Sequence, residues 1–294
     1  MSDHIGMLSE AENATAVAEA AANGAGVAVR PLSDPAELRA VCRLFDGIWH
    51  PDPADAAVTP SLLRALSKAG SYVAGAYDCG GGGLIGACVG FFAAPTRQEL
   101  HSHVAGVSAA ARGRSVGRAL KLHQRAWALS QGVTTVTWTF DPLVSRNAYV
   151  NLVKLGATPA QYLPDFYGSM GDAINGNDLT DRLLLRWELT ADHVARAARG
   201  LHGRWDAATL RENGAVAGLG RSPDGRPLAG TADGRTVLVA VPPDIESLRR
   251  ADPACAREWR AAVRDTLGPL LDRGAAVVGF DRAGWYVLDR GENR

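Results

Sequence analysis

The sequence predicts an α/β fold, because β-rich segments alternate with segments of helical periodicity along its first 190 residues. The segment 133–140 (Val-Thr-Thr-Val-Thr-Trp-Thr-Phe) is rich in β-branched and aromatic residues and has the character of a buried strand. It lies between two helical segments, 116–131 and 146–155, which end at Gly132 and Gly156. Helices on either side of a buried strand are typical of α/β domains.

The elements expected in this part follow the order strand, two helices, three strands, helix, strand, helix, strand. Asp34 and Pro35 provide a cap and a proline that a helix tolerates at its start. Four consecutive glycines, 80–83, join two β-rich segments and open no helix, which favours a hairpin connection over a phosphate-binding loop. The expected ranges are 26–32, 35–48, 60–69, 71–77, 84–92, 100–107, 116–131, 133–140, 146–155 and 182–189.

Three parts are predicted along the chain. Residues 1–25 are rich in alanine and lack aromatic residues, and we expect a loose, flexible N-terminal arm there that is partly helical. Residues 26–190 form the α/β domain. Residues 191–294 form a C-terminal α+β extension, in which turn sequences separate short strands and a long helical stretch runs from about 244 to 273.

The charge balance and the cysteine spacing argue against several classes of partner and site. Lys plus Arg and Asp plus Glu are both 31, so no overall field favours DNA, RNA or an anionic membrane as a partner. The four cysteines show no Cys-x-x-Cys spacing, and we expect neither a disulfide framework nor a metal site. Neither a signal peptide nor an apolar run of about 18 residues is evident, so a cytoplasmic protein is expected.

The segment that carries chemistry is a strand leading into a loop rich in glycine and arginine, which then opens a helix at residue 116. The first turn of a helix leaves N–H groups without partners and carries partial positive charge, so a pyrophosphate fits there. Arg112, Arg114 and Arg118 add positive charge nearby. The residues alone leave a second interpretation open, a solvated basic helix start with no ligand.

Residues 114–119 (Arg-Ser-Val-Gly-Arg-Ala) resemble the Q/R-x-x-G-x-G/A signature of GNAT acyltransferases. The resemblance implies a GNAT fold for residues 26–190, with a mixed central sheet flanked by helices. It also implies that backbone amides of the loop bind the pyrophosphate of acyl-CoA, and that amides near the end of the preceding strand polarise the thioester carbonyl. The cofactor-binding residues it implies are Gly106, Val107, Arg112, Gly113, Arg114, Ser115, Val116, Gly117, Arg118 and Ala119.

A second segment, 145–157, resembles the superfamily helix N-x-x-A-x-x-x-Y-x-K-x-G-F, but Leu152 stands where the usual general-acid tyrosine is found. The run 138–143 (Trp-Thr-Phe-Asp-Pro-Leu) and the long C-terminal part resemble one bacterial branch of GNAT proteins, which includes members similar to amino-acid N-succinyltransferases. The resemblance therefore implies acetyl-CoA or succinyl-CoA as donor and a small-molecule amine as acceptor, with direct attack in a ternary complex. A non-catalytic module that binds acyl-CoA, and a homodimer, are left open.

Catalytic and acceptor-binding candidates lie in and after three predicted strands. A general base works best with a pKa near the working pH, which suggests His103, with His101 next. Asp141 follows the strand 133–140 and is a candidate to hold the acceptor ammonium. Asp181 and Arg182 are candidates to bind a polar acceptor, since a guanidinium suits a carboxylate. For each of these residues a purely structural role is the alternative.

Overall fold

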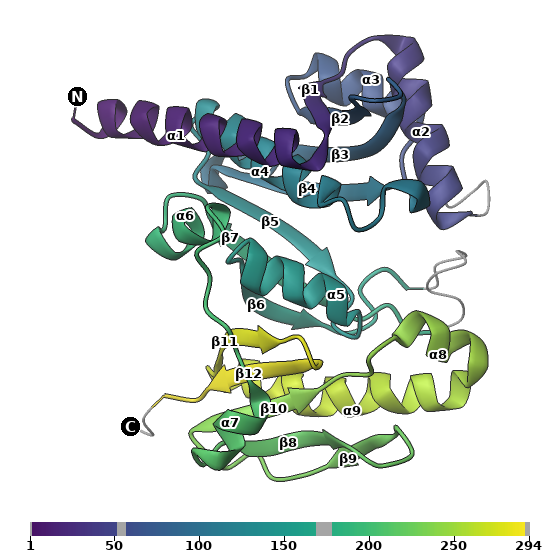
Figure 1. Cartoon of the computed structure of the whole chain (residues 1–294), viewed down its shortest axis with the longest axis vertical. Coiled ribbons are helices and arrows are strands. Elements are labelled where there is room, and N and C mark those ends of the chain that lie inside the picture. The colour runs from purple at the N-terminus through teal and green to yellow at the C-terminus, as the bar shows by residue number, and fades with distance from the viewer. Residues whose placement is uncertain (1, 52–56, 169–177, 292–294) are drawn as a thin grey trace. The chain divides into compact units, whose positions relative to one another are not determined.

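The structure is a computed structural model of the chain, and it describes residues 2–51, 57–168 and 178–291, with side chains from Ser9 onward (Figure 1). Its contacts divide the chain into two compact units. The first unit comprises Met1–Trp138 and Trp187–Arg199, and the second comprises Thr139–Arg186 and Gly200–Arg294. This division differs from the predicted boundary at residue 190, because the chain passes from one unit to the other within strands β5 and β7.

The larger sheet has seven strands in the order β1-β2-β3-β4-β5-β7-β6. Neighbours from β1 to β4 are antiparallel, β4 and β5 are parallel, and β6 and β7 are antiparallel. The mixed central sheet that was predicted is therefore confirmed. The strands are β1 (Val27–Pro31), β2 (Tyr72–Asp78), β3 (Leu84–Phe92), β4 (Glu99–Val107), β5 (Thr135–Phe140), β6 (Thr158–Leu163) and β7 (Arg182–Glu188).

Helices cover both faces of the sheet in the first unit. The apolar side of α2 packs with α3 on one face, where Leu38 and Phe45 join Val89 and Val104 in one core cluster. Helix α4 packs on the opposite face, where Gly86 lies against Leu120. These helices are α2 (Pro35–Trp49), α3 (Pro60–Lys68), α4 (Val116–Ser130) and α6 (Asp192–Ala198), with short 3-10 turns η1 (Pro95–Arg97) and η2 (Ala109–Ala111).

The N-terminal segment is helical rather than a loose arm. Helix α1 (Ser2–Ala25) packs along α4, and Ala11, Ala14 and Ala18 are buried at intervals of three and four residues. Alanine has the highest helix propensity of all residues and lets two helices approach closely, so the composition that suggested a loose segment also suits a packed helix. The prediction for residues 1–25 is corrected accordingly.

The second unit holds a five-stranded sheet in the order β11-β12-β10-β8-β9, in which only the pair β8–β10 is parallel. Its core includes Trp259, which donates a hydrogen bond to the carbonyl of Gly225. Its remaining elements are α5 (Ser145–Ala148), the π-helical stretch η3 (Tyr149–Lys154), α7 (Ala207–Glu212), β8 (Val216–Arg221), β9 (Pro227–Ala229), β10 (Thr236–Ala240), α8 (Ile245–Ala251), α9 (Pro253–Asp272), β11 (Ala276–Asp281) and β12 (Trp285–Asp289).

Within the described ranges, no helix combines the length and the apolar character needed to cross a bilayer.

Candidate functional site

The loop between β4 and α4 makes a sharp turn directly before the helix. Gly113 and Ser115 have left-handed backbone, with φ of +84° and +64°. Ser115 is the residue that precedes α4, and its side chain makes no capping hydrogen bond. A non-glycine residue in this conformation is uncommon and points to a local demand on the backbone.

The turn leaves a cluster of hydrogen-bond donors unused. The first bond of α4 runs from the N–H of Ala119 to the carbonyl of Ser115, at 3.1 Å. Among the residues that the structure describes, five backbone N–H groups before this bond have no acceptor, those of Gly113, Ser115, Val116, Gly117 and Arg118. Consecutive N–H groups at a helix start bind anions with several oxygens.

The hydroxyl of Ser108 adds a sixth polar group in the same connection. Its Oγ is buried and has no hydrogen-bond partner in the described part of the chain. A buried polar group without a partner calls for an explanation such as a missing ligand. There is room for one, since a Cβ at Gly113 would meet nothing within 4 Å and a Cβ at Gly117 would meet only Val107, at 3.7 Å.

Two of the three predicted phosphate-binding arginines direct their side chains elsewhere. Arg114 pairs with Asp78 at 2.6 Å and also bonds the carbonyls of Ala25 and Gly26. Arg118 donates to the carbonyl of Ala198 at 2.5 Å. Arg112 is exposed. The structure thus pairs the side chains of Arg114 and Arg118 with other groups, and their contacts to a phosphate stay predictions, whereas the N–H of Arg118 belongs to the donor cluster.

Strand β4 contains a bulge at the predicted general base. Ser102 pairs with Gly90 and Val104 pairs with Val89, so His103 is an extra residue without a partner in β3. Its Nε2 lies 3.4 Å from the carbonyl oxygen of Ala57. Bulges re-aim side chains and occur often beside active sites.

His101 is poorly suited to accept a proton. Its Nδ1 lies 3.2 Å from the Thr137 hydroxyl. Burial, together with the neighbouring His103 and Lys121, lowers the pKa of His101 to about 4. His101 is therefore neutral at physiological pH and a weak base there.

Gly106, near the end of β4, is required by close packing. A Cβ at this position would lie 2.7 Å from Trp49 and 2.8 Å from Ile48, both at the end of α2. Any side chain would therefore displace the tryptophan from the strand. The pairing of β4 with β5 has already ended five residues earlier, at His101 and Thr137, so β4 has no partner on that edge from Ser102 onward among the described residues.

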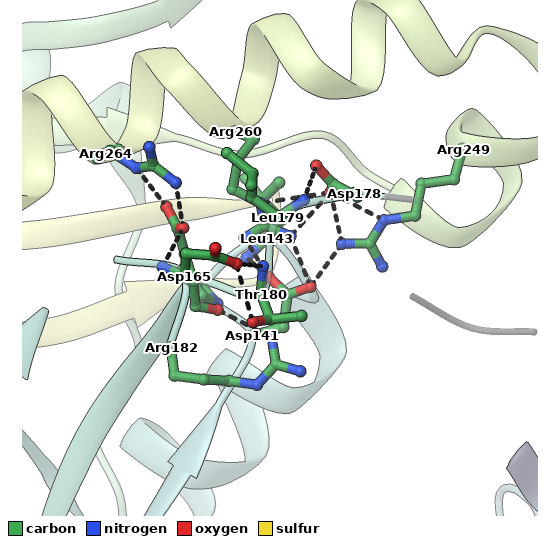
Figure 2. Close-up of polar contacts among 12 residues, drawn as sticks. Asp141, Leu143, Asp165, Asp178, Leu179, Thr180, Arg182, Arg249, Arg260 and Arg264 are labelled. Atoms are coloured by element: carbon green, nitrogen blue, oxygen red, sulfur yellow. Dashed lines mark hydrogen bonds and ion pairs between the residues drawn. The ribbon is translucent and has the colours of Figure 1, made fainter. Parts of the chain in front are cut away.

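In the second unit, Asp141 lies in a buried network of ion pairs (Figure 2). One carboxylate oxygen accepts from the N–H of Leu143 at 2.9 Å and from Arg260 at 2.8 Å, and the other accepts from Arg260 and from Arg249, at 2.9 and 2.6 Å. Asp178 bonds the same two arginines at 3.0 Å each. Both oxygens of Asp141 are therefore occupied.

The charge of Asp141 is fixed by these neighbours. Burial alone would raise its pKa, but Arg260 and Arg249 hold the pKa well below its usual range. A carboxylate that stays ionised and fully bonded is poorly suited to hold an ammonium or to accept a proton. The geometry favours a structural role for Asp141 over the predicted catalytic one.

Asp181 and Arg182, the predicted acceptor-binding pair, are also buried in this unit. Asp181 is ion-paired with Arg264 and accepts from the Tyr162 hydroxyl at 2.7 Å. The Arg182 guanidinium donates to the carbonyl of Asp181 and lies 5.3 Å from the ring centre of Tyr167. The structure thus groups Asp141, Asp181 and Arg182 in one unit, and His103 and the donor cluster in the other.

The ion pairs predict acid sensitivity. The pKa values of Asp141 and Asp181 are lowered on folding, so their contribution to stability is present above the unfolded pKa of about 4 and is lost as the pH falls further. We expect the free energy of unfolding to fall steeply from pH 4 to pH 2 in urea titrations. Asp141→Asn should unfold more easily at pH 7 and flatten this slope, and an unchanged slope would contradict the prediction.

A buried lysine is the feature of the first unit that sequence reasoning missed. Lys121 of α4 donates to Ser102 at 2.8 Å and to Gln124 at 3.0 Å, and its Nζ lies 3.9 Å from the ring centre of Trp138. Only its position on the row of α4 that faces the sheet could have indicated burial. Within the ranges described, no group of three or more His, Cys, Asp or Glu residues is placed to hold a metal ion.

Several solved acetyltransferase structures are similar to this chain. They include the ribosomal-protein-S5-alanine acetyltransferase from Vibrio fischeri (15% identity, TM-score 0.46, 56% of this chain and 94% of that chain). An acetyltransferase of the GNAT family from Streptococcus pneumoniae is 13% identical, with a TM-score of 0.45 and coverage of 54% of this chain and 98% of that chain. A Salmonella typhimurium protein described as an acetyltransferase, solved with its cofactor acetyl-CoA, is 17% identical, with a TM-score of 0.46 and coverage of 57% and 96%. No protein-family model matches the chain, and no curated protein matches it by sequence.

Proposed function

We propose that this chain is an N-acyltransferase of the GNAT superfamily that transfers the acetyl group of acetyl-CoA to a primary amine of a small molecule. The observation that carries the proposal is the donor cluster before α4, five backbone N–H groups without an acceptor among the described residues, in the same connection as the unpartnered Ser108 hydroxyl. The acetyltransferases that resemble the chain, one of them solved with acetyl-CoA, support the choice of donor.

The residues of the loop fit a diphosphate. Its oxygens would accept from the N–H groups of Gly113 and of residues 115–118, and the partial charge of the helix start favours the anion. Ser108 offers a further hydrogen bond to the same ligand. Arg112 is the exposed side chain left to contact the phosphates as a cation.

The unpaired edge of β4 supports a place for the rest of the donor. A strand edge without a neighbour presents backbone N–H and carbonyl groups, which suit the amide groups of the pantetheine arm. The donor would then run from the loop toward Ser102 along β4. Gly106 and Val107, at the loop end of β4, would then contact the pantetheine arm, and an amide nearer Ser102, where the pairing with β5 ends, would polarise the thioester carbonyl.

His103 is the proposed general base. It is the bulged residue of β4, only partly buried, and it lies on the same strand as the proposed thioester site. The amine must lose a proton to attack the carbonyl carbon directly in a ternary complex, and an imidazole near neutral pH is suited to take it. Asp181 and Arg182 remain the proposed acceptor-binding residues. We also propose a cytoplasmic location for the protein.

The proposal is tested by binding and turnover on the purified chain. We expect calorimetry to show acetyl-CoA binding, and we expect free-thiol release when an amine panel is added, with the product identified by mass spectrometry. Succinyl-CoA is tested in parallel, and faster release of free thiol with succinyl-CoA would indicate that it is the donor. Failure to bind either donor contradicts the proposal. Binding without release of free thiol on any amine would indicate a non-catalytic module that binds acyl-CoA. Leu152, in place of the usual tyrosine, is the reason for testing this alternative.

Replacing His103 by alanine should lower kcat about 100-fold or more, because general-base catalysis contributes roughly that factor. The dissociation constant for acetyl-CoA should stay within about threefold, since the imidazole is proposed to face the acceptor rather than the donor. His202→Ala, at a partly buried histidine of the second unit, is the matched control. Unchanged turnover in His103→Ala would indicate that His103 has only a structural role.

A further inference from the structure

Lys121 is a buried cation without a counter-ion. Its side chain is 8% exposed, and its three N–H donors are directed to Ser102, Gln124 and the face of Trp138. No ion pair connects it to a carboxylate in the described part of the chain. Burying a charge without an opposite charge is costly, and groups of this kind gather at functional sites.

The lysine lies where two neighbouring strands stop pairing. His101 and Thr137 form the last pair of β4 with β5, and the next residues along the two strands are Ser102 and Trp138. These are the two residues that Lys121 bridges from α4. The ammonium of Lys121 therefore lies beside Ser102, at one end of the unpaired edge of β4. The thioester of a donor bound along that edge would lie toward this end.

We propose that Lys121 is a positioning residue for acyl transfer, whose ammonium at the end of the β4–β5 pairing stabilises the thiolate of CoA as it leaves. This inference rests on the proposed function. In the superfamily helix a tyrosine usually protonates the thiolate, and this chain has Leu152 at that position. The field of Lys121 would stabilise the thiolate in the absence of that tyrosine.

The step balances without a proton donor at the sulfur. The amine nitrogen forms the new C–N bond, the C–S bond breaks with its electron pair on sulfur, and His103 takes the proton that the amine loses. The leaving group departs as a thiolate and is protonated by water after release. Since the three donors of Lys121 are already used, the lysine acts through its field rather than by proton transfer.

The field of Lys121 depends on pH within the physiological range. Burial lowers the pKa of Lys121 to about 8, and the titratable groups that act on it are Cys88 of β3 and His101 of β4, both neutral at pH 7. The elements that pack against α4 also carry charged and titratable groups, and each of these groups has a partner. From α1, Glu10 pairs with Arg125; from β1, Arg30 pairs with Glu37; and from β2, Tyr72 bonds His123.

The test measures the ionisation of the CoA thiol while it is bound, by the ultraviolet absorbance of the thiolate. A free thiol has a pKa of about 8.5, and we expect the bound thiol to ionise about tenfold more readily in the wild type. Lys121→Arg, which keeps the charge, should preserve the shift, and Lys121→Met should abolish it. At pH 6, where the thiol is protonated, all three proteins should bind CoA with similar affinity.

The outcomes separate the two proposals. A wild type that does not bind CoA at pH 6 contradicts the proposed function and this inference with it. A wild type that binds CoA but leaves the thiol pKa unshifted, or a Lys121→Met protein that keeps the shift, overturns the inference alone.

A measurement on the wild type covers the case in which Lys121→Met does not fold. The affinity for CoA relative to desulfo-CoA should rise as the pH increases from 6 to 8, because only CoA can form a thiolate beside the ammonium. A ratio that is constant across this range overturns the inference.

Discussion

Gly117→Asp is expected to abolish acetyl-CoA binding, with a loss of at least about 100-fold in affinity. The substitution places a carboxylate among the five N–H groups that the diphosphate would occupy, so like charges would be brought together and donors would be consumed. The fold should be retained, because an acidic residue in the first turn of a helix is favourable. Calorimetry gives the affinity, and circular dichroism with thermal unfolding checks the fold.

Gly117→Ala is the matched control for this prediction. A Cβ at Gly117 would contact only the side chain of Val107, at 3.7 Å, and the residue has no positive φ that only glycine favours. Alanine should therefore bind acetyl-CoA nearly as well as glycine does. Wild-type affinity in the aspartate variant would show that the diphosphate lies elsewhere and would remove the main support for the proposed function.

Elements with a strong local signal were predicted well from the sequence. The expected strand 84–92 agrees with β3 in both bounds, and the glycine run before it is the hairpin connection that was expected. Strand β6 was missed, because its sequence contains Pro159 and five of its six residues are partly or fully exposed without regular alternation. An edge strand with a proline gives little periodic signal.

The second helical segment was only partly correct. Helix 146–155 was expected, and the structure has four α-helical residues followed by the π-helical stretch Tyr149–Lys154. Side-chain periodicity does not distinguish an α-helix from a short π-helical stretch, which holds one extra residue per turn.

Partners far apart in sequence explain why the candidate site was predicted only in part. The loop 112–119 was recognised because its glycines and the following helix are local signals. The Asp141 network could not be predicted, since Arg249 and Arg260 are 108 and 119 residues away. Arg118 likewise bonds the carbonyl of Ala198 at the end of α6, 80 residues away in the sequence.

Arg260→Met is expected to lower the stability of the second unit by about 3–5 kcal/mol, the usual cost of removing one member of a buried ion pair. Arg260 is 2% exposed and bonds both Asp141 and Asp178, which are 8% and 5% exposed at their side chains. Its loss would leave two buried carboxylates sharing the single guanidinium of Arg249. Urea denaturation at pH 7 measures the change, and the effect should shrink below pH 4 as the carboxylates protonate.

Arg226→Met is the matched control, because Arg226 is an arginine of the same unit whose pairs with Asp252 and Glu258 are exposed. Exposed ion pairs contribute about 1 kcal/mol or less, so this variant should unfold almost as the wild type does. Equal effects of the two substitutions would show that the Asp141 network is solvated in solution. Asp141 would then regain the freedom to bind an ammonium, and the catalytic role first predicted for it would again be the better interpretation.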